Sequence, residues 1–188
     1  GKADLVFADN GIYSAPVYFT SISNGDGTFQ APAPTAFPQI APSANFDISN
    51  AVSGLQVASL KKGSNASLIF SFNEVAGGTG VNPYNLGIVV LPGNGNGTFQ
   101  APVVTATYSS TSPPTAAFSP QVEAIADLNG DGNADLIVNV PGTVITNFQL
   151  QNQLEVLLGN GDGTFKTPIP IASVPDLYSI PVIADLNK

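Results

Sequence analysis

Oxygen-bearing side chains alternate along one nine-residue segment, DLNGDGNAD at 127–135. Carboxylates or amides occupy every odd position of the segment, namely Asp127, Asn129, Asp131, Asn133 and Asp135. Calcium takes about six to eight oxygen ligands, and short side chains at alternating positions of a curled loop can converge on one ion. The glycines at positions 4 and 6 allow such a curl. The segment therefore predicts a calcium site, with Asn133 offering its backbone carbonyl.

Two other interpretations of this segment are an EF-hand and a metal-free turn. An EF-hand is excluded because position 12 is Val138 instead of a bidentate glutamate, and the residues around it are typical of a strand. An Asx-rich turn that binds no metal is the plainer alternative. We favour calcium, because three carboxylates this close repel one another unless a cation lies between them.

Two motifs recur along the chain and divide it into repeats. NGDGTF at 24–29, NGNGTF at 94–99 and NGDGTF at 160–165 begin 70 and 66 residues apart. The oxygen-rich segment recurs in eroded form at 58–70, ASLKKGSNASLIF, where serine, lysine and glycine replace its acids. We therefore expect no metal in that copy.

The two ends of the chain carry complementary parts of the same motif. Asp185 and Asn187 match its positions 1 and 3, and Asp4 matches its position 9. If the ends meet, these three residues predict a second, weaker metal site.

Each repeat contains four short apolar runs and no helical period. In the best copy we expect strands at about 121–127, 135–140, 153–158 and 165–173. NGDG between apolar runs is typical of a hairpin turn, so Asp26 and Asp162 are interpreted as turn residues rather than ligands. Four-stranded meanders stacked face to face predict an all-β fold of β-propeller blades.

The paired motifs resemble the FG-GAP/VCBS repeats, the calcium-binding propeller repeats of integrin α-subunits and many bacterial surface proteins. The resemblance implies one segment of about three blades, with repeats at approximately 1–53, 54–120 and 121–188. A last strand at the C-terminus would complete the first blade. It also implies a fragment or half of a larger or oligomeric propeller, calcium as cofactor, and a secreted or cell-surface location, with cell adhesion and a bacterial source.

The composition argues against several classes of function. The formal net charge is −8, all five basic residues are lysines, and histidine and cysteine are absent. Nucleic acid is therefore a poor partner, since phosphates need clustered cations. The commonest general base and the thiol nucleophile are missing, so we expect no enzyme. No apolar run is long enough for a membrane helix.

The expected function is recognition of an extracellular protein through the long connections, 36–53, 73–85, 107–120 and 141–152. Four tyrosines fall in or beside these segments and are candidate ligand-binding residues: Tyr13, Tyr84, Tyr108 and Tyr178. Equally, these rings could pin the loops to the blades. A carbohydrate-binding propeller is the alternative function. The phenylalanine that ends each turn motif is expected to pack between blades.

Three blades form an open arc with two uncovered faces. If each face exposes on the order of 500 Å² of apolar surface, burying it would contribute about 12 kcal/mol of hydrophobic free energy per face. We therefore expect self-association, as a dimer that forms a six-bladed ring, or further blades in a longer chain.

Overall fold

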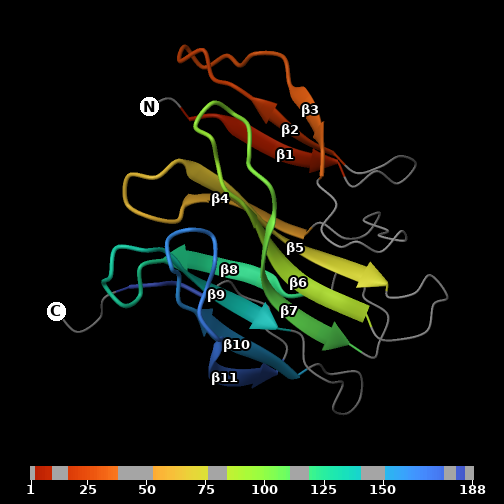
Figure 1. Ribbon diagram of the computed structural model, residues 1–188, viewed down its shortest axis with the longest axis vertical. Coiled ribbons are helices and arrows are strands. Elements are labelled where there is room, and N and C mark those ends of the chain that lie inside the picture. The colour runs from red at the N-terminus through yellow and green to blue at the C-terminus, as the bar shows by residue number, and fades with distance from the viewer. Residues whose placement is uncertain are drawn as a thin grey trace.

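The computed structural model describes residues 3–9, 17–37, 53–75, 84–110, 119–140, 151–175 and 181–184 (Figure 1). Every regular element in these ranges is a strand, which confirms the all-β prediction. Within the same ranges no helix has the length and hydrophobicity to span a membrane.

The strands form three antiparallel sheets, each a meander of consecutive strands, which we call blades. Blade 1 contains β1 (Leu5–Asp9), β2 (Val17–Ser21) and β3 (Ala33–Ala36). Blade 2 contains β4 (Ser53–Ser59), β5 (Ala66–Val75), β6 (Tyr84–Leu91) and β7 (Val103–Ser110). Blade 3 contains β8 (Gln121–Ala126), β9 (Asp135–Val140), β10 (Gln151–Leu157) and β11 (Ile169–Pro175). The blades stack in sequence order (Figure 1), so the arrangement is propeller-like, and the described ranges show no closed ring.

Blades 2 and 3 repeat each other down to their irregularities. The pairing of the last two strands shifts register at Ile88/Val89 in blade 2 and at Leu154/Glu155 in blade 3. These positions lie 66 residues apart, which is also the spacing of the two turn motifs. Equivalent positions in the repeats can therefore be compared directly.

The hydrophobic core consists of two clusters, one in each gap between neighbouring blades. The first joins blade 1 to blade 2 through residues that include Tyr18, Leu68 and Phe70. The second joins blade 2 to blade 3 through residues that include Ile69 and Leu136. Because neighbouring residues of a strand point to opposite faces, β5 contributes to both clusters. This explains its continuous apolar sequence.

The phenylalanines of the turn motifs confirm part of the expected packing between blades. Phe99 meets Tyr18 of blade 1 edge to face, with ring centroids 5.7 Å apart, and Phe165 packs against the cluster between blades 2 and 3. Phe29, in blade 1, is 46% exposed. Its counterparts face the preceding blade, and the described residues place no blade in front of blade 1.

Two glycines allow the turns to pack closely against the neighbouring strand. A Cβ atom on Gly93 would lie 1.9 Å from the Ala66 carbonyl oxygen, and one on Gly159 would lie 2.1 Å from the Ala134 carbonyl oxygen. Only glycine permits this approach without moving the backbone. The turn after β10 is therefore held against the beginning of β9.

The short loops lie on one side of the stack, at the same end of each blade's strands (left in Figure 1). They are the loops after β4 and β8 and the turns after β2, β6 and β10. The fourth strand of blade 3 begins at Ile169 instead of 165, because Phe165 makes only an isolated bridge to Gly159 across the turn. Pro181–Ala184, where the sequence predicts the start of a further strand, pairs with no strand in the described ranges.

Candidate metal-binding loop

The oxygen-rich segment is the loop between β8 and β9, and the antiparallel pair Ala126↔Asp135 closes its base. Gly130 and Gly132 adopt φ values of 77° and 87°, where residues with a Cβ are strained. These two conformations curl the chain so that successive amides point back toward the start of the loop.

Asp127 organises the curl. Its Oδ1 accepts hydrogen bonds from the amides of Gly130 at 2.7 Å and Asp131 at 3.1 Å, and its Oδ2 accepts one from the amide of Gly132 at 2.9 Å. Position 1 of the loop thus acts as an acceptor for three amides of the turn that follows it.

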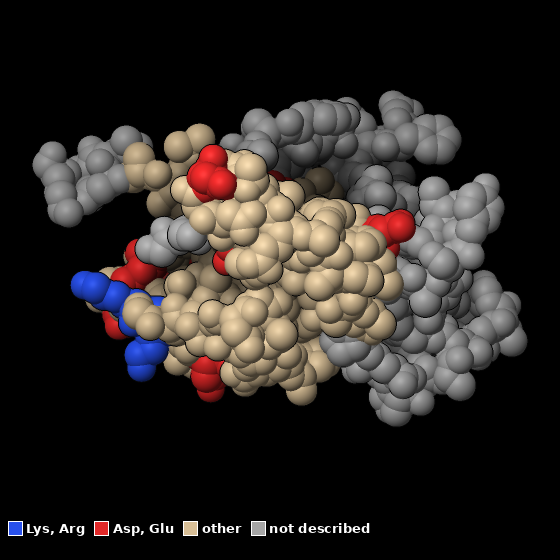
Figure 2. Space-filling model, turned by 90° about the horizontal axis from the view of Figure 1, so that it is seen from above, with Lys and Arg blue, Asp and Glu red and all other residues tan. Residues whose placement is uncertain are grey.

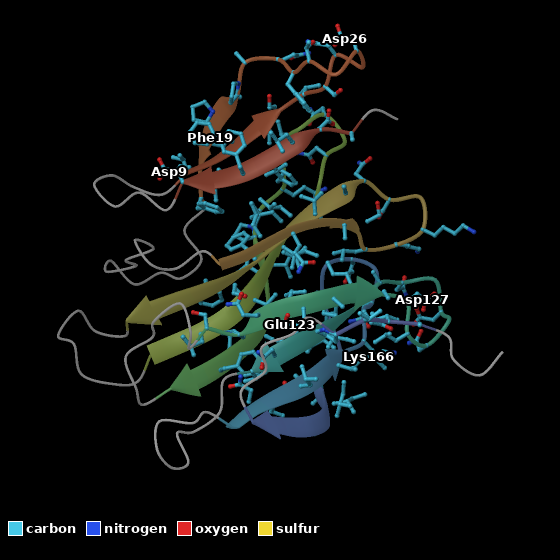
Figure 3. All side chains as sticks on the ribbon, turned by 180° about the vertical axis from the view of Figure 1, so that it is seen from behind. Asp9, Phe19, Asp26, Glu123, Asp127 and Lys166 are labelled. Atoms are coloured by element: carbon cyan, nitrogen blue, oxygen red, sulfur yellow. The ribbon has the colours of Figure 1, made fainter. Side chains whose placement is uncertain are left out.

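Asp131 and Asn129 are linked on the exposed side of the loop. Asp131 Oδ1 accepts the amide of Asn133 at 2.8 Å, and its Oδ2 accepts Asn129 Nδ2 at 3.0 Å. Asn129 Oδ1 in turn accepts the amide of Asp131 at 2.9 Å. The amide of Asn133 and then the side chain of Asn129 hold the pKa of Asp131 below its usual value, and the positive charge of Lys166 adds to this. Asp127 and Lys166 lie at the same end of blade 3 (Figure 3).

Asp135 differs from the other acids because it is fully buried. Its Oδ2 accepts the amide of Leu128 at 2.8 Å, and its Oδ1 accepts the amide of Gly159 at 2.8 Å. The carboxylate therefore ties the loop after β8 to the turn after β10. Asp4 makes the equivalent contact in blade 1, where its Oδ1 accepts the amide of Ser23 at 2.9 Å.

The donor chemistry of the loop fits a hard cation. In the described ranges, no three Asp, Glu, His or Cys side chains are grouped closely enough to hold an ion. The acids of the loop instead accept amides, yet Asp127 Oδ2 and both oxygens of Asp131 accept only one of these bonds each and so keep a further lone pair. Asp127 and Asp131 are exposed, so they can turn toward an ion without opening the core.

The eroded loop of blade 2 lies against the loop of blade 3. Lys62 donates its amide to the Gly132 carbonyl at 3.2 Å, and Ala134 donates its amide to the Leu60 carbonyl at 2.9 Å. Lys62 and Asp127 also line one cavity of about 520 Å³ between the two blades. The position of the oxygen-rich loop is thus fixed by its neighbour as well as by its own strands.

The turn acids serve the turns. Asp26 Oδ1 accepts both the amide of Thr28 at 2.9 Å and its hydroxyl at 2.6 Å. Asp162 makes the same pair of bonds with Thr164 at 2.9 and 2.6 Å. Asn96 makes them with Thr98 at 3.1 and 2.7 Å. An amide oxygen replaces the carboxylate here because the turn needs only an acceptor.

Most of the other candidate residues have no described side chain. Asp185, Asn187, Tyr13 and Tyr178 lie outside the described residues, and of Tyr84 only the backbone, in β6, is described.

Tyr108 of β7 packs against the cluster between blades 2 and 3. Its hydroxyl donates to Glu155 of β10 at 3.2 Å. Burial, followed by the charge of Glu155, raises the pKa of Tyr108. This contact agrees with a tyrosine that holds two blades together.

The structural role of Asp135 is the feature that sequence reasoning missed. The available signal was that Asp4 and Asp135 both precede a leucine and an apolar strand, while the intervening copy has Ser67 there. That pattern identifies the repeat position but not the amide that the carboxylate meets.

Residues 127–188, that is 62 of the 188 residues, match the family model of the FG-GAP-like repeat. The match begins at the first residue of the oxygen-rich loop and confirms the repeat type in this segment. No curated protein and no solved structure matches the chain significantly. Repeats of this type support a β-propeller-type module and are generally non-catalytic.

Proposed function

Because residues 127–188 form an FG-GAP-like repeat, we propose that the chain is a non-catalytic, calcium-stabilised β-propeller module of a secreted or cell-surface protein. The observation that carries this proposal is the loop at 127–135, where five carboxylate and amide side chains lie along a curled segment that is joined to the turn after β10.

Calcium would serve the structure of the module. Asp127, Asn129 and Asp131 would supply side-chain oxygens from the exposed part of the loop, Asn133 a carbonyl, and Asp135 an oxygen from the buried base. When bound, the ion neutralises the repulsion between the carboxylates. Through the contact of Asp135 with Gly159, an ion in the loop would also stabilise the turn after β10.

Recognition of a protein ligand is proposed for the opposite end of the blades. The meander topology puts the connections between the second and third strands there, together with those that join one blade to the next. Repeat proteins commonly bind through such variable insertions. Most of the residues concerned lie outside the described ranges, so this part of the proposal rests on topology and sequence.

The calcium proposal is tested by isothermal titration with calcium and by thermal unfolding with calcium or with chelator. The wild-type chain should bind calcium and show a higher Tm with the ion than with chelator. Asp131→Ala should lose both effects, because it removes a proposed ligand. The variant should still fold, because Asp131 is exposed and its removal leaves the core intact. Asp162→Asn is the matched control, since Asn96 already performs the same role, and it should behave as wild type.

Equal Tm values and no heat of binding in the wild-type chain would contradict the proposal. Calcium binding that survives Asp131→Ala but is lost in Asp4→Ala would place the site at the chain ends, with Asp185 and Asn187.

A further inference from the structure

The outer face of blade 1 exposes positions that are fully buried in the other two blades. Leu5 is 47% exposed, whereas its equivalents Leu68 and Leu136 are 0% exposed. Phe7 is 39% exposed, whereas its equivalents Phe70 and Val138 are 0% exposed. In blades 2 and 3 these positions pack against the preceding blade, and blade 1 makes no such contact among the described residues.

Aromatic rings add to this face. Phe7 stacks on Phe19 of β2 with ring centroids 5.0 Å apart, and Phe29 is exposed beside the turn. Phe19 lies on the side of blade 1 away from blade 2 (Figure 3). Figure 2 looks onto blade 1 and shows a broad uncharged surface, with acidic side chains mostly toward its margins and lysines at one side.

The outer face of blade 3 carries the opposite half of the same contact. In blade 2 the residues that pack toward the next blade include Ile69, Ile88 and Val90, all 0% exposed. Their equivalents in blade 3 are Ile137, Leu154 and Val156, which belong to neither core cluster and are only partly buried. Ile169 and Ile171 are 49% and 54% exposed on the last strand.

We propose that these two faces bind each other between copies of the chain, so that blade 3 of one copy docks on blade 1 of a second copy. The chain already forms this contact twice, between blades 1 and 2 and between blades 2 and 3. The docking would continue the same contact to a third junction. Two copies joined head to tail at both ends form a ring of six blades.

An open strand edge supports the second copy as the occupant. Among the described residues, blades 2 and 3 have four strands and blade 1 has three, and β1 pairs there with β2 alone. Residues 184–188, ADLNK, repeat the ADLNG that begins at Ala126 at the end of β8, so Pro181–Ala184 corresponds to the last part of that first strand. Val182 is 90% exposed in this segment. In the assembly, the segment from one copy pairs with β1 of the next and completes its blade.

This inference rests on the propeller-type module of the proposed function but not on calcium. Failure of calcium to bind would leave the apolar contact in place. A monomeric chain that binds calcium would overturn the assembly and leave the calcium proposal intact.

The test is the molar mass measured by light scattering after gel filtration, with Phe7→Asp as the variant of the first face and Ile169→Lys as the variant of the second. Wild type should have twice the mass of the chain. Each variant alone should be monomeric at the same concentration, with dissociation constants raised at least about tenfold. Val104→Asp is the matched control, because Val104 is 41% exposed on β7 of the middle blade, and it should remain a dimer.

Mixing the two variants distinguishes head-to-tail docking from a symmetric contact between two identical faces. A mixed dimer has one junction with native residues on both sides, so the mixture should dimerise more tightly than either variant alone. A wild-type monomer would overturn the proposal. So would a dimer that one of the two variants leaves unchanged, because head-to-tail docking uses both faces. Circular dichroism of each variant shows that it is folded.

Discussion

At the scale of single residues, Asp135 combines two roles that the sequence does not separate. Its spacing from Asp127 predicted a calcium ligand, and that prediction still awaits its test. Its burial and its bond to Gly159 also make it a structural cross-link between the loop after β8 and the turn after β10. The second role could not be predicted because Gly159 is 24 residues away and is brought close only by the pairing of β9 with β10.

Asp135→Ala should therefore destabilise the chain even in the presence of chelator. The substitution leaves the amides of Leu128 and Gly159 without their acceptor, of which the Gly159 bond is buried. Lost hydrogen bonds to a charged group of this kind cost about 2–4 kcal/mol. The measurement is the free energy of unfolding from urea titrations in chelator.

Asp135→Asn is the informative comparison, because it keeps one acceptor oxygen and should lose less than the alanine variant. A free energy of unfolding equal to wild type in Asp135→Ala would show that the carboxylate serves only a ligand.

At the scale of elements, the turns after β2 and β10 use a carboxylate oxygen as acceptor where the turn after β6 uses an amide oxygen. Asp26 and Asp162 carry lowered pKa values, caused first by the side chain of the following threonine and then by its amide. Because its pKa is lowered in the folded state, each carboxylate stabilises the fold fully above the ordinary pKa near 3.8. This stabilisation is lost as pH falls through the lowered pKa. The turn with Asn96 has no such group.

The Asp26→Asn, Asp162→Asn double variant should therefore lose less Tm than wild type between pH 5 and pH 2, with similar Tm at neutral pH. The reverse change, Asn96→Asp, should increase the loss over the same range. Melting curves across the acidic range give the comparison. Identical acid dependence in all three chains would show that these turns do not contribute.

The strands and turns could largely be predicted from sequence, because alternation, apolar runs and NGDG are local signals. β9 lies at 135–140 as expected. The start of β11 was missed by four residues because the bridge between Gly159 and Phe165 continues the turn. That the eroded loop of blade 2 binds no metal stays a prediction. The contact of this loop with the blade 3 loop was not predicted, since it depends on how the blades stack.

At the scale of the whole molecule, the blades differ in how many neighbours they have. Within the part of the chain that the structure describes, blade 2 is covered on both faces, whereas blades 1 and 3 each have one covered face. In stacked repeats, stability is approximately a sum over units and their neighbouring contacts. Uneven stability along the chain follows.

Hydrogen exchange should reveal this gradient. Amides of β5 and β6 should exchange most slowly, and those of β1 at least about tenfold faster in a monomeric variant such as Ile169→Lys. Mass spectrometry of peptic fragments gives both rates. Uniform exchange across the three blades would mean that the chain unfolds as one unit.

The mismatch between the two end faces has a consequence for growth. A contact between unlike surfaces carries no intrinsic stop, so a copy bound at one junction alone presents a fresh acceptor until the ring closes. Whether the chain yields a finite particle or a fibre then depends on the curvature added at each junction. The small rotation from one blade to the next would decide the outcome: a rotation that closes the ring gives a soluble particle, and one that does not gives a polymer.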